Sequence, residues 1–141
     1  MKKPFELFQR YKKNPIITPE NFSYPINTVF NAGAALLNGE TLLLIRVEDR
    51  RGISHLTAAR SKNGFDSWDI DSKPTFKPDP DNYPEEMWGI EDPRITFLED
   101  SKMWAICYTA YSENGPLVSI ARTDDFRQFK RQGAAVLHAP G

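Results

Sequence analysis

The sequence predicts an all-β fold, and three observations support that prediction. The 141 residues contain 8 Gly and 11 Pro beside 3 Trp, 5 Tyr and 9 Phe, a composition typical of short strands joined by tight turns. The apolar runs are short and alternate with turn signals such as Asn38-Gly39 and Asn63-Gly64. The order of these runs and turns occurs twice along the chain. The length and the 40% of hydrophobic residues fit one domain with a sizeable core.

The first half of the chain is predicted to form a four-stranded meander. After a lead-in over residues 1–27, the runs 29–37 and 41–47 flank Asn38-Gly39, a two-residue hairpin signal that requires positive φ at both positions. The run 53–59 and a short run at 68–70, joined through Asn63-Gly64, complete the meander. We therefore place the first unit at residues 28–73.

The second half resembles the first at an offset of 62 residues. Under this offset Leu36-Leu37 falls on Leu98-Glu99, and Ala59-Arg60-Ser61 falls on Ala121-Arg122-Thr123. The repeat places a second unit at residues 89–132 and the start of a third at 133–141. Residues 74–88 contain four prolines, too many for a central strand, and are predicted to form a connecting loop. Two unrelated meanders with similar spacing are the alternative.

Four-stranded units that recur along a chain favour a β-propeller, because radial repetition leaves only short, protected sheet edges. In a propeller the first strand of each unit lines the central channel. Asn31 and Asp92 lie at the starts of the two first strands, 61 residues apart. We therefore expect both side chains at one rim of the channel, where polar groups from remote parts of the chain form a small-molecule pocket.

Charge and cysteine content exclude several classes of protein. With 18 Lys and Arg against 19 Asp and Glu, the net charge of -1 favours neither nucleic acid nor an anionic membrane as a partner. Cys107 is the single cysteine, and neither His55 nor His138 has the spacing of a metal site, so no metal or bound cofactor is expected. Residues 1–13 lack a secretory apolar region, and we expect a cytoplasmic protein.

The sharpest local motif is Gly89-Ile90-Glu91-Asp92-Pro93-Arg94. Pro93 fixes its own φ and biases Asp92 towards an extended conformation, so the Asp92 carboxylate is expected to be held rigidly. By strand alternation, Asp92 and Arg94 point to the same face. The motif therefore predicts a functional carboxylate, or, as the plainer alternative, a turn in which Arg94 pairs with Asp92.

A second candidate is Arg46, at the end of an apolar strand. By alternation Arg46 shares a face with Leu42 and Leu44, and a charge there needs a partner. Its guanidinium is suited to bind sugar hydroxyls, a carboxylate or a phosphate, whereas the plainer reading is a solvated turn with surface ion pairs. Among the aromatic residues, we single out Trp88 and Tyr108 as candidates for stacking on a sugar ring.

These motifs together resemble glycoside hydrolase family 130, the β-mannoside phosphorylases and related mannosidases, which are built as five-bladed β-propellers. The matching segments run in the family's order: NPII at 14–17, FNAGA at 30–34, LLIRVED at 43–49, ARS at 59–61 followed by Asn63-Gly64, EDPR at 91–94 and YTA at 108–110. A series of motifs that covers nearly the whole chain is far more specific than any one of them.

The resemblance implies roles for particular residues. Asp92 is the implied general acid, which delivers its proton to the glycosidic oxygen through a sugar hydroxyl. Asn31 and Arg46 match positions that hold the mannosyl ring. The remaining motif residues implied to line the same pocket are Asp49, Arg50, Glu91 and Arg94, of which Glu91 departs from the tyrosine found in some members.

The family also limits the reaction. An inverting hydrolase needs a second carboxylate, roughly 6.5–9.5 Å from the acid, to activate water, whereas inorganic phosphate as co-substrate is already a nucleophile. The cationic residues that seat phosphate in the family come mostly from blades later than residue 141. We therefore predict a phosphorylase or hydrolase acting on β-mannosides, with a small carbohydrate as partner. A silent fragment or sugar-binding module is one alternative, and a propeller glycosidase acting on arabinans or fructans is another.

The chain length bears on this prediction. Five blades at this repeat need about 310 residues, so 141 residues correspond to about two blades plus a lead-in, an incomplete propeller. Open blade edges at this length favour a homo-oligomer.

Overall fold

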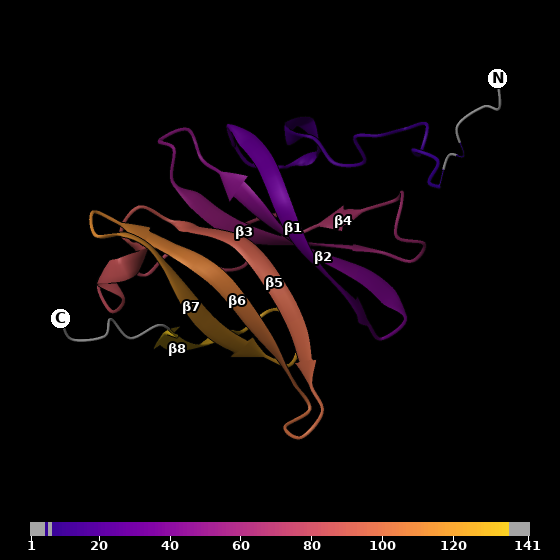
Figure 1. The fold of residues 1–141 in the computed structure, drawn as a ribbon. Helices are drawn as coiled ribbons and strands as arrows, with labels where there is room; N and C mark the ends of the chain where they lie inside the picture. Colours follow the sequence, from indigo (N-terminus) through magenta and orange to yellow (C-terminus); the bar gives the residue numbers. More distant parts are fainter. Residues whose placement is uncertain (1–4, 6, 136–141) are drawn as a thin grey trace.

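The computed structural model describes residue 5 and residues 7–135, which form two four-stranded antiparallel sheets (Figure 1). The first sheet has the order β1 (Thr28–Leu37), β2 (Glu40–Glu48), β3 (Ser54–Ser61) and β4 (Asp69–Ile70). The second has the order β5 (Ile90–Leu98), β6 (Met103–Ser112), β7 (Gly115–Thr123) and β8 (Lys130–Ala134). The all-β prediction and both meanders are confirmed.

The boundaries of the elements differ little from the prediction. The 3₁₀ helix η1 (Pro19–Asn21) lies in the lead-in, and η2 (Pro84–Glu86) lies in the connecting segment. Strand β8 runs to Ala134, so the second sheet extends two residues past the predicted boundary at 132. The rest of the predicted third unit, residues 136–141, lies outside the described residues. Within the described part of the chain, no helix has the length and apolar character needed to cross a membrane.

The main core lies between the two sheets. Alternate residues of β2, Leu42 and Leu44, point towards the second sheet and are fully buried with Ile106 of β6. Strands β1 and β5 lie against each other, and Gly33 permits this approach, because a Cβ there would be 2.9 Å from the Pro93 carbonyl oxygen. The other face of the first sheet carries a smaller cluster, covered by part of the lead-in and by Trp68.

Both first strands contain a β-bulge at the same place in the ladder. In β1, Phe30 and Asn31 lie opposite the single residue Arg46, and in β5, Asp92 and Pro93 lie opposite Tyr108. The ladders therefore match at an offset of 62, which pairs Asp92 with Phe30. The expected equivalence of Asn31 and Asp92, which are 61 residues apart, is therefore wrong by one residue, and Asn31 matches Pro93 instead.

The connecting segment is anchored at both ends. Phe76 exchanges two backbone hydrogen bonds of 2.9 Å with Leu56 of β3. Further along, the fully buried Glu86 accepts hydrogen bonds from the Tyr108 hydroxyl at 2.6 Å and from Arg131 Nε at 2.9 Å. The segment predicted as a loop is thus fixed to both sheets, and it leads directly into β5.

Candidate functional site

The candidate site is centred on Arg46, which joins the two sheets at the rim where β1 and β5 begin. Arg46 Nη1 donates to Asp92 Oδ1 at 3.0 Å, and Arg46 Nη2 lies 2.9 Å from Glu91 Oε1. Arg46 Nε donates to Ser54 Oγ at 3.1 Å, and the guanidinium carbon lies 4.7 Å from the centre of the Phe30 ring. Each guanidinium nitrogen therefore has a partner, and both carboxylates come from the opposite sheet.

The sequence places Arg46 at this junction by simple alternation. Leu42, Leu44 and Arg46 share the face of β2 that points at the second sheet, and Arg46 is the member that lies beyond the apolar core. The bulge in β1 leaves Arg46 opposite two residues, as described above. Glu91 and Asp92 supply the charge partner that Arg46 was predicted to need. The alternative interpretation, a solvated turn with surface ion pairs, is therefore wrong for Arg46.

Ser54 is held in place by Gly89. The two residues form an isolated parallel bridge, and a Cβ on Gly89 would be only 2.7 Å from the Ser54 backbone nitrogen. Gly89 also has a φ of 118°, in the region that favours glycine. A glycine is therefore required at position 89, because the chain entering β5 passes close to the backbone of Ser54, which accepts a hydrogen bond from Arg46.

Asp92 does not have the extended conformation that Pro93 led us to expect. Its φ is 49°, in the left-handed region, and it is the first residue of the β5 bulge. Pro93 has no N–H for the ladder, and the bulge accommodates that loss. The bulge also breaks the alternation: Arg94 is exposed, and within the described residues the ion pair of Asp92 is with Arg46.

The two carboxyl groups on Arg46 have different environments. Burial raises the pKa of Glu91, Arg46 opposes that rise, and the charges of Asp92 and Glu48 add to it. The side chain of Asp92 is 36% exposed and that of Glu91 is 22% exposed. Asp92 is thus the carboxyl group that a ligand reaches more easily, while Glu91 lies deeper beside the guanidinium.

The structure does not gather all the predicted site residues around Arg46. Asn31 is exposed on β1, beside Phe30, and Arg50 is exposed in the turn between β2 and β3. Asp49 instead accepts hydrogen bonds from the backbone N–H groups of Arg51 and Ile53, and thereby closes its own turn. Burial on its own would raise the pKa of Asp49. The backbone hydrogen bonds and the Arg51 side chain together outweigh burial, so the pKa of Asp49 is lowered.

The two residues proposed to stack on a sugar ring differ in exposure. Trp88 is 42% exposed and packs edge-on against Tyr111, with 5.4 Å between ring centres. Tyr108 is 2% exposed and donates its hydroxyl to Glu86, and burial together with the Glu86 carboxylate raises its pKa. The structure therefore corrects the sugar-stacking role predicted for Tyr108, which belongs to the core.

Sequence reasoning missed Ser54 and Phe30, the other two partners of Arg46. Ser54 begins β3, on the face shared with Leu56, and alternation from the core would have indicated it. Phe30 immediately precedes Asn31, but its contact with Arg46 depends on the bulge and has no signal in the sequence.

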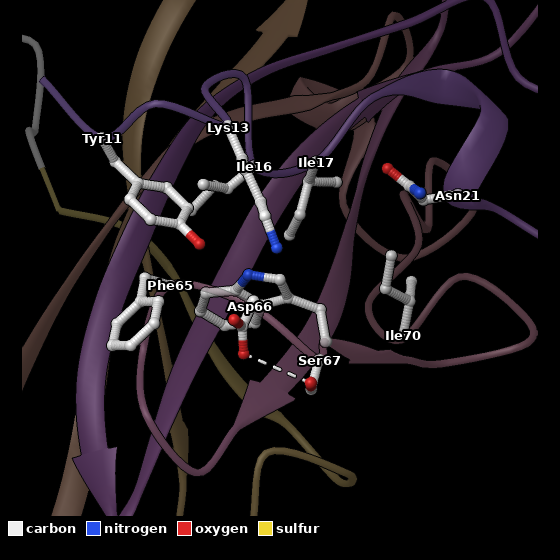
Figure 2. A pocket seen from close by; sticks show the side chains of 10 residues that line it. Tyr11, Lys13, Ile16, Ile17, Asn21, Phe65, Asp66, Ser67 and Ile70 are labelled. Carbon is white, nitrogen blue, oxygen red and sulfur yellow. Dashed lines mark hydrogen bonds between the residues drawn. The ribbon is translucent and has the colours of Figure 1, made fainter.

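Two cavities lie near the first sheet without including Arg46 or its carboxylate partners. Figure 2 shows a cavity of about 240 Å³ between the lead-in and the turn before β4, with Tyr11, Lys13, Phe65 and Asp66 on its walls. A larger cavity of about 490 Å³ lies where the connecting segment meets the start of β3. Among the residues that the structure describes, no three His, Cys, Asp or Glu side chains gather closely enough to hold a metal ion.

Comparison with known proteins gives a consistent result. The family model of the β-1,4-mannooligosaccharide phosphorylases matches residues 3–139. The β-1,2-mannobiose phosphorylase of Listeria innocua is 29% identical, over 88% of this chain and 50% of that protein. The 4-O-β-D-mannosyl-D-glucose phosphorylase of Bacteroides fragilis is 30% identical, over 89% of this chain and 34% of that protein.

The fold is similar to that of a solved relative. A glycosyl hydrolase from Bacteroides ovatus superimposes with a TM-score of 0.81 and 33% identity, over 94% of this chain and 42% of that one. The chain thus spans between a third and a half of the length of the curated relatives that it matches.

Proposed function

The chain belongs to glycoside hydrolase family 130, and from this membership we propose that it forms the proton-donor side of a pocket that acts on β-mannosides. One observation carries the proposal: Arg46 of the first sheet holds Glu91 and Asp92 of the second sheet at a shared rim. Both named curated relatives are mannoside phosphorylases, which favours phosphate over water as the attacking group.

The proposal includes the architecture of the pocket. The two sheets are consecutive blades of a five-bladed propeller, and β1 and β5 are the strands that line its channel. Support comes from the matching order and register of the two meanders, and from the contact between β1 and β5. Asp92, Arg46 and Asn31 then face the channel from one rim.

Asp92 is the proton donor in this proposal. Cleavage breaks the bond between the anomeric carbon and the glycosidic oxygen, and the proton of Asp92 passes to that oxygen through a sugar hydroxyl. When Asp92 is protonated, Arg46 keeps Glu91 as its counter-ion, so the guanidinium is not left without a negative partner.

Inorganic phosphate supplies the new bond in the phosphorolytic form of the reaction. A phosphate oxygen attacks the anomeric carbon from the opposite face, and the products are a sugar 1-phosphate and the released sugar. This route needs cationic groups to seat the phosphate and does not need a second carboxylate as base.

Product analysis tests the proposal. The chain is incubated with β-1,2- and β-1,4-linked mannobiose, with and without phosphate, and mannose and mannose 1-phosphate are measured. Asp92→Asn is expected to lower turnover by about a hundredfold or more, since it removes the proton donor. Asp100→Asn, a change of the same type in an exposed turn, is the matched control.

Two results would overturn parts of the proposal. Equal turnover by the parent chain and by Asp92→Asn would show that Asp92 is not the proton donor. Calorimetric binding of mannobiose without turnover in either condition would support a sugar-binding module instead of an enzyme.

A further inference from the structure

The larger cavity has the character of a small-molecule site. Its volume of about 490 Å³ is in the range of ligand pockets. Its apolar walls are formed by residues of the lead-in, the turn before β3 and the connecting segment: Pro25, Ile53, Pro74, Pro78, Pro80 and Met87. Prolines lose little conformational freedom when a ligand packs on them, because the ring already fixes the backbone. The walls therefore offer rigid C–H surfaces to a ring-shaped ligand.

His55 is the buried polar group of this cavity. It is 7% exposed, and its Nε2 lies 3.0 Å from the Tyr24 hydroxyl, which is also 2.6 Å from Thr57 Oγ1. No hydrogen bond within the described residues involves His55 Nδ1. Burial lowers the pKa of His55 to about 4, Asp49 opposes the shift and Lys77 adds to it, so the ring is neutral near pH 7. A sugar hydroxyl suits Nδ1 in either tautomer, because a hydroxyl both donates and accepts.

The cavity also carries a positive charge. Arg51 Nη2 lies 2.7 Å from Asp49 Oδ2, and this pair neutralises itself. Lys77 lines the same cavity, and within the described part of the chain it makes no ion pair. The side chain of Lys77 is exposed, so its ammonium group is free to meet an anionic group at the mouth.

We propose that this cavity binds an anionic monosaccharide, a hexose ring that carries a phosphate or a carboxylate group. The ring packs against the prolines and Met87, a ring hydroxyl pairs with His55 Nδ1, and the anionic group pairs with Lys77. His55 follows Ser54 directly in β3, so the two side chains point to opposite faces of the sheet. The cavity therefore lies on the opposite face of β3 from Arg46, and this inference does not depend on the proposed function.

Titration of the full chain tests the inference. Mannose 6-phosphate, glucuronate, mannose and inorganic phosphate are added separately, while the imidazole NMR signals are followed. The chain has two histidines, and the signal of His55 is identified by its loss in His55→Gln. The two anionic sugars are expected to shift the His55 signal saturably, and mannose and phosphate to bind about tenfold more weakly, because each lacks one of the two contacts.

Variants separate the contacts of the ligand. Lys77→Gln is expected to weaken binding of both anionic sugars by about threefold to tenfold, as measured by calorimetry, and His55→Gln is expected to weaken it similarly if the variant folds. Lys73→Gln changes an exposed lysine four residues earlier in the chain that does not line the cavity, and this control is expected to bind as the parent does. Asp92→Asn is also expected to leave this binding unchanged, which separates it from the proposed function.

Four results would overturn the inference. No saturable shift of the His55 signal at about 10 mM anionic sugar would remove the site. If inorganic phosphate bound as tightly as the anionic sugars, the sugar ring would make no contact that contributes to binding. If mannose bound as tightly as they do, the anionic group would contribute nothing. Equal weakening by Lys73→Gln and Lys77→Gln would show a general charge effect instead of a contact.

Discussion

The buried carboxylate of Glu86 offers the sharpest test of how the connecting segment is held. Glu86 Oε1 accepts from the Tyr108 hydroxyl and from Arg131 Nε, and Oε2 accepts from Arg131 Nη2 and from the Asp79 backbone N–H. Glu86→Gln keeps the shape of the side chain and removes its charge. The new amide nitrogen then faces two donors that it cannot accept from.

The structure sets the expected magnitude. Loss of one partner of a buried ion pair costs about 3–5 kcal/mol, because the other charge stays buried. The Arg131 side chain is 12% exposed, but its guanidinium still stacks 4.2 Å from the centre of the Phe76 ring and donates to the Lys77 carbonyl oxygen. These remaining contacts place the expected loss at the low end, about 3 kcal/mol.

Urea unfolding followed by tryptophan fluorescence measures this loss. With a slope of about 2 kcal/mol per M, a loss of about 3 kcal/mol lowers the midpoint by about 1.5 M. Glu113→Gln, the same change at an exposed position in the turn between β6 and β7, is expected to leave the midpoint within about 0.3 M. Equal midpoints for the two variants would refute the argument that the ion pair of Glu86 anchors the segment.

Three further predictions use the same measurement. Gly89→Ala is expected to lower the free energy of unfolding by about 3 kcal/mol or more, because its Cβ would meet the Ser54 backbone. Gly115→Ala, at a φ of 90° in open space, is expected to lower it by about 1 kcal/mol. Equal losses for the two variants would contradict the role of the contact with Ser54. Burial lowers the pKa of His55 to about 4 in the folded chain, against about 6.5 for an exposed histidine, so protonation of His55 favours the unfolded chain. The stability of the fold is therefore unaffected by His55 above pH 6.5 and falls by about 2–3 kcal/mol as the pH drops to about 4. His55→Gln is expected to remove that part of the pH dependence, and superimposable curves for variant and parent would contradict this. Arg46→Lys is expected to cost about 1–2 kcal/mol, because an ammonium group cannot hold two carboxylates in a fixed fork, and an unchanged midpoint would show that the bridge between the sheets contributes little.

Local patterns in the sequence were sufficient for some of these features. The hairpin at Asn38-Gly39 forms with positive φ at both residues, because two such residues in sequence admit few other structures. The orientation of Arg46 towards the second sheet also follows from alternation along one regular strand. Each of these predictions depends on residues that are adjacent in the chain.

Other features depend on pairs that are remote in the chain. The left-handed conformation of Asp92 follows from the register between β5 and β6, which alternation within β5 does not reveal. The buried hydroxyl of Tyr108 pairs with Glu86, 22 residues earlier, in a segment whose prolines predicted only a connecting loop. A single sequence gives no signal for such pairs.

The two bulges have a consequence for how the chain can vary. A residue opposite a bulge faces two residues where a regular ladder has one, so its side chain is not tied to a fixed cross-strand neighbour. Arg46 and Tyr108 occupy this same ladder position in the two sheets, yet one reaches across to the neighbouring sheet and the other reaches the connecting segment. The side chain opposite the bulge therefore decides which neighbouring element each sheet contacts. The register of the paired strands is the same in both cases.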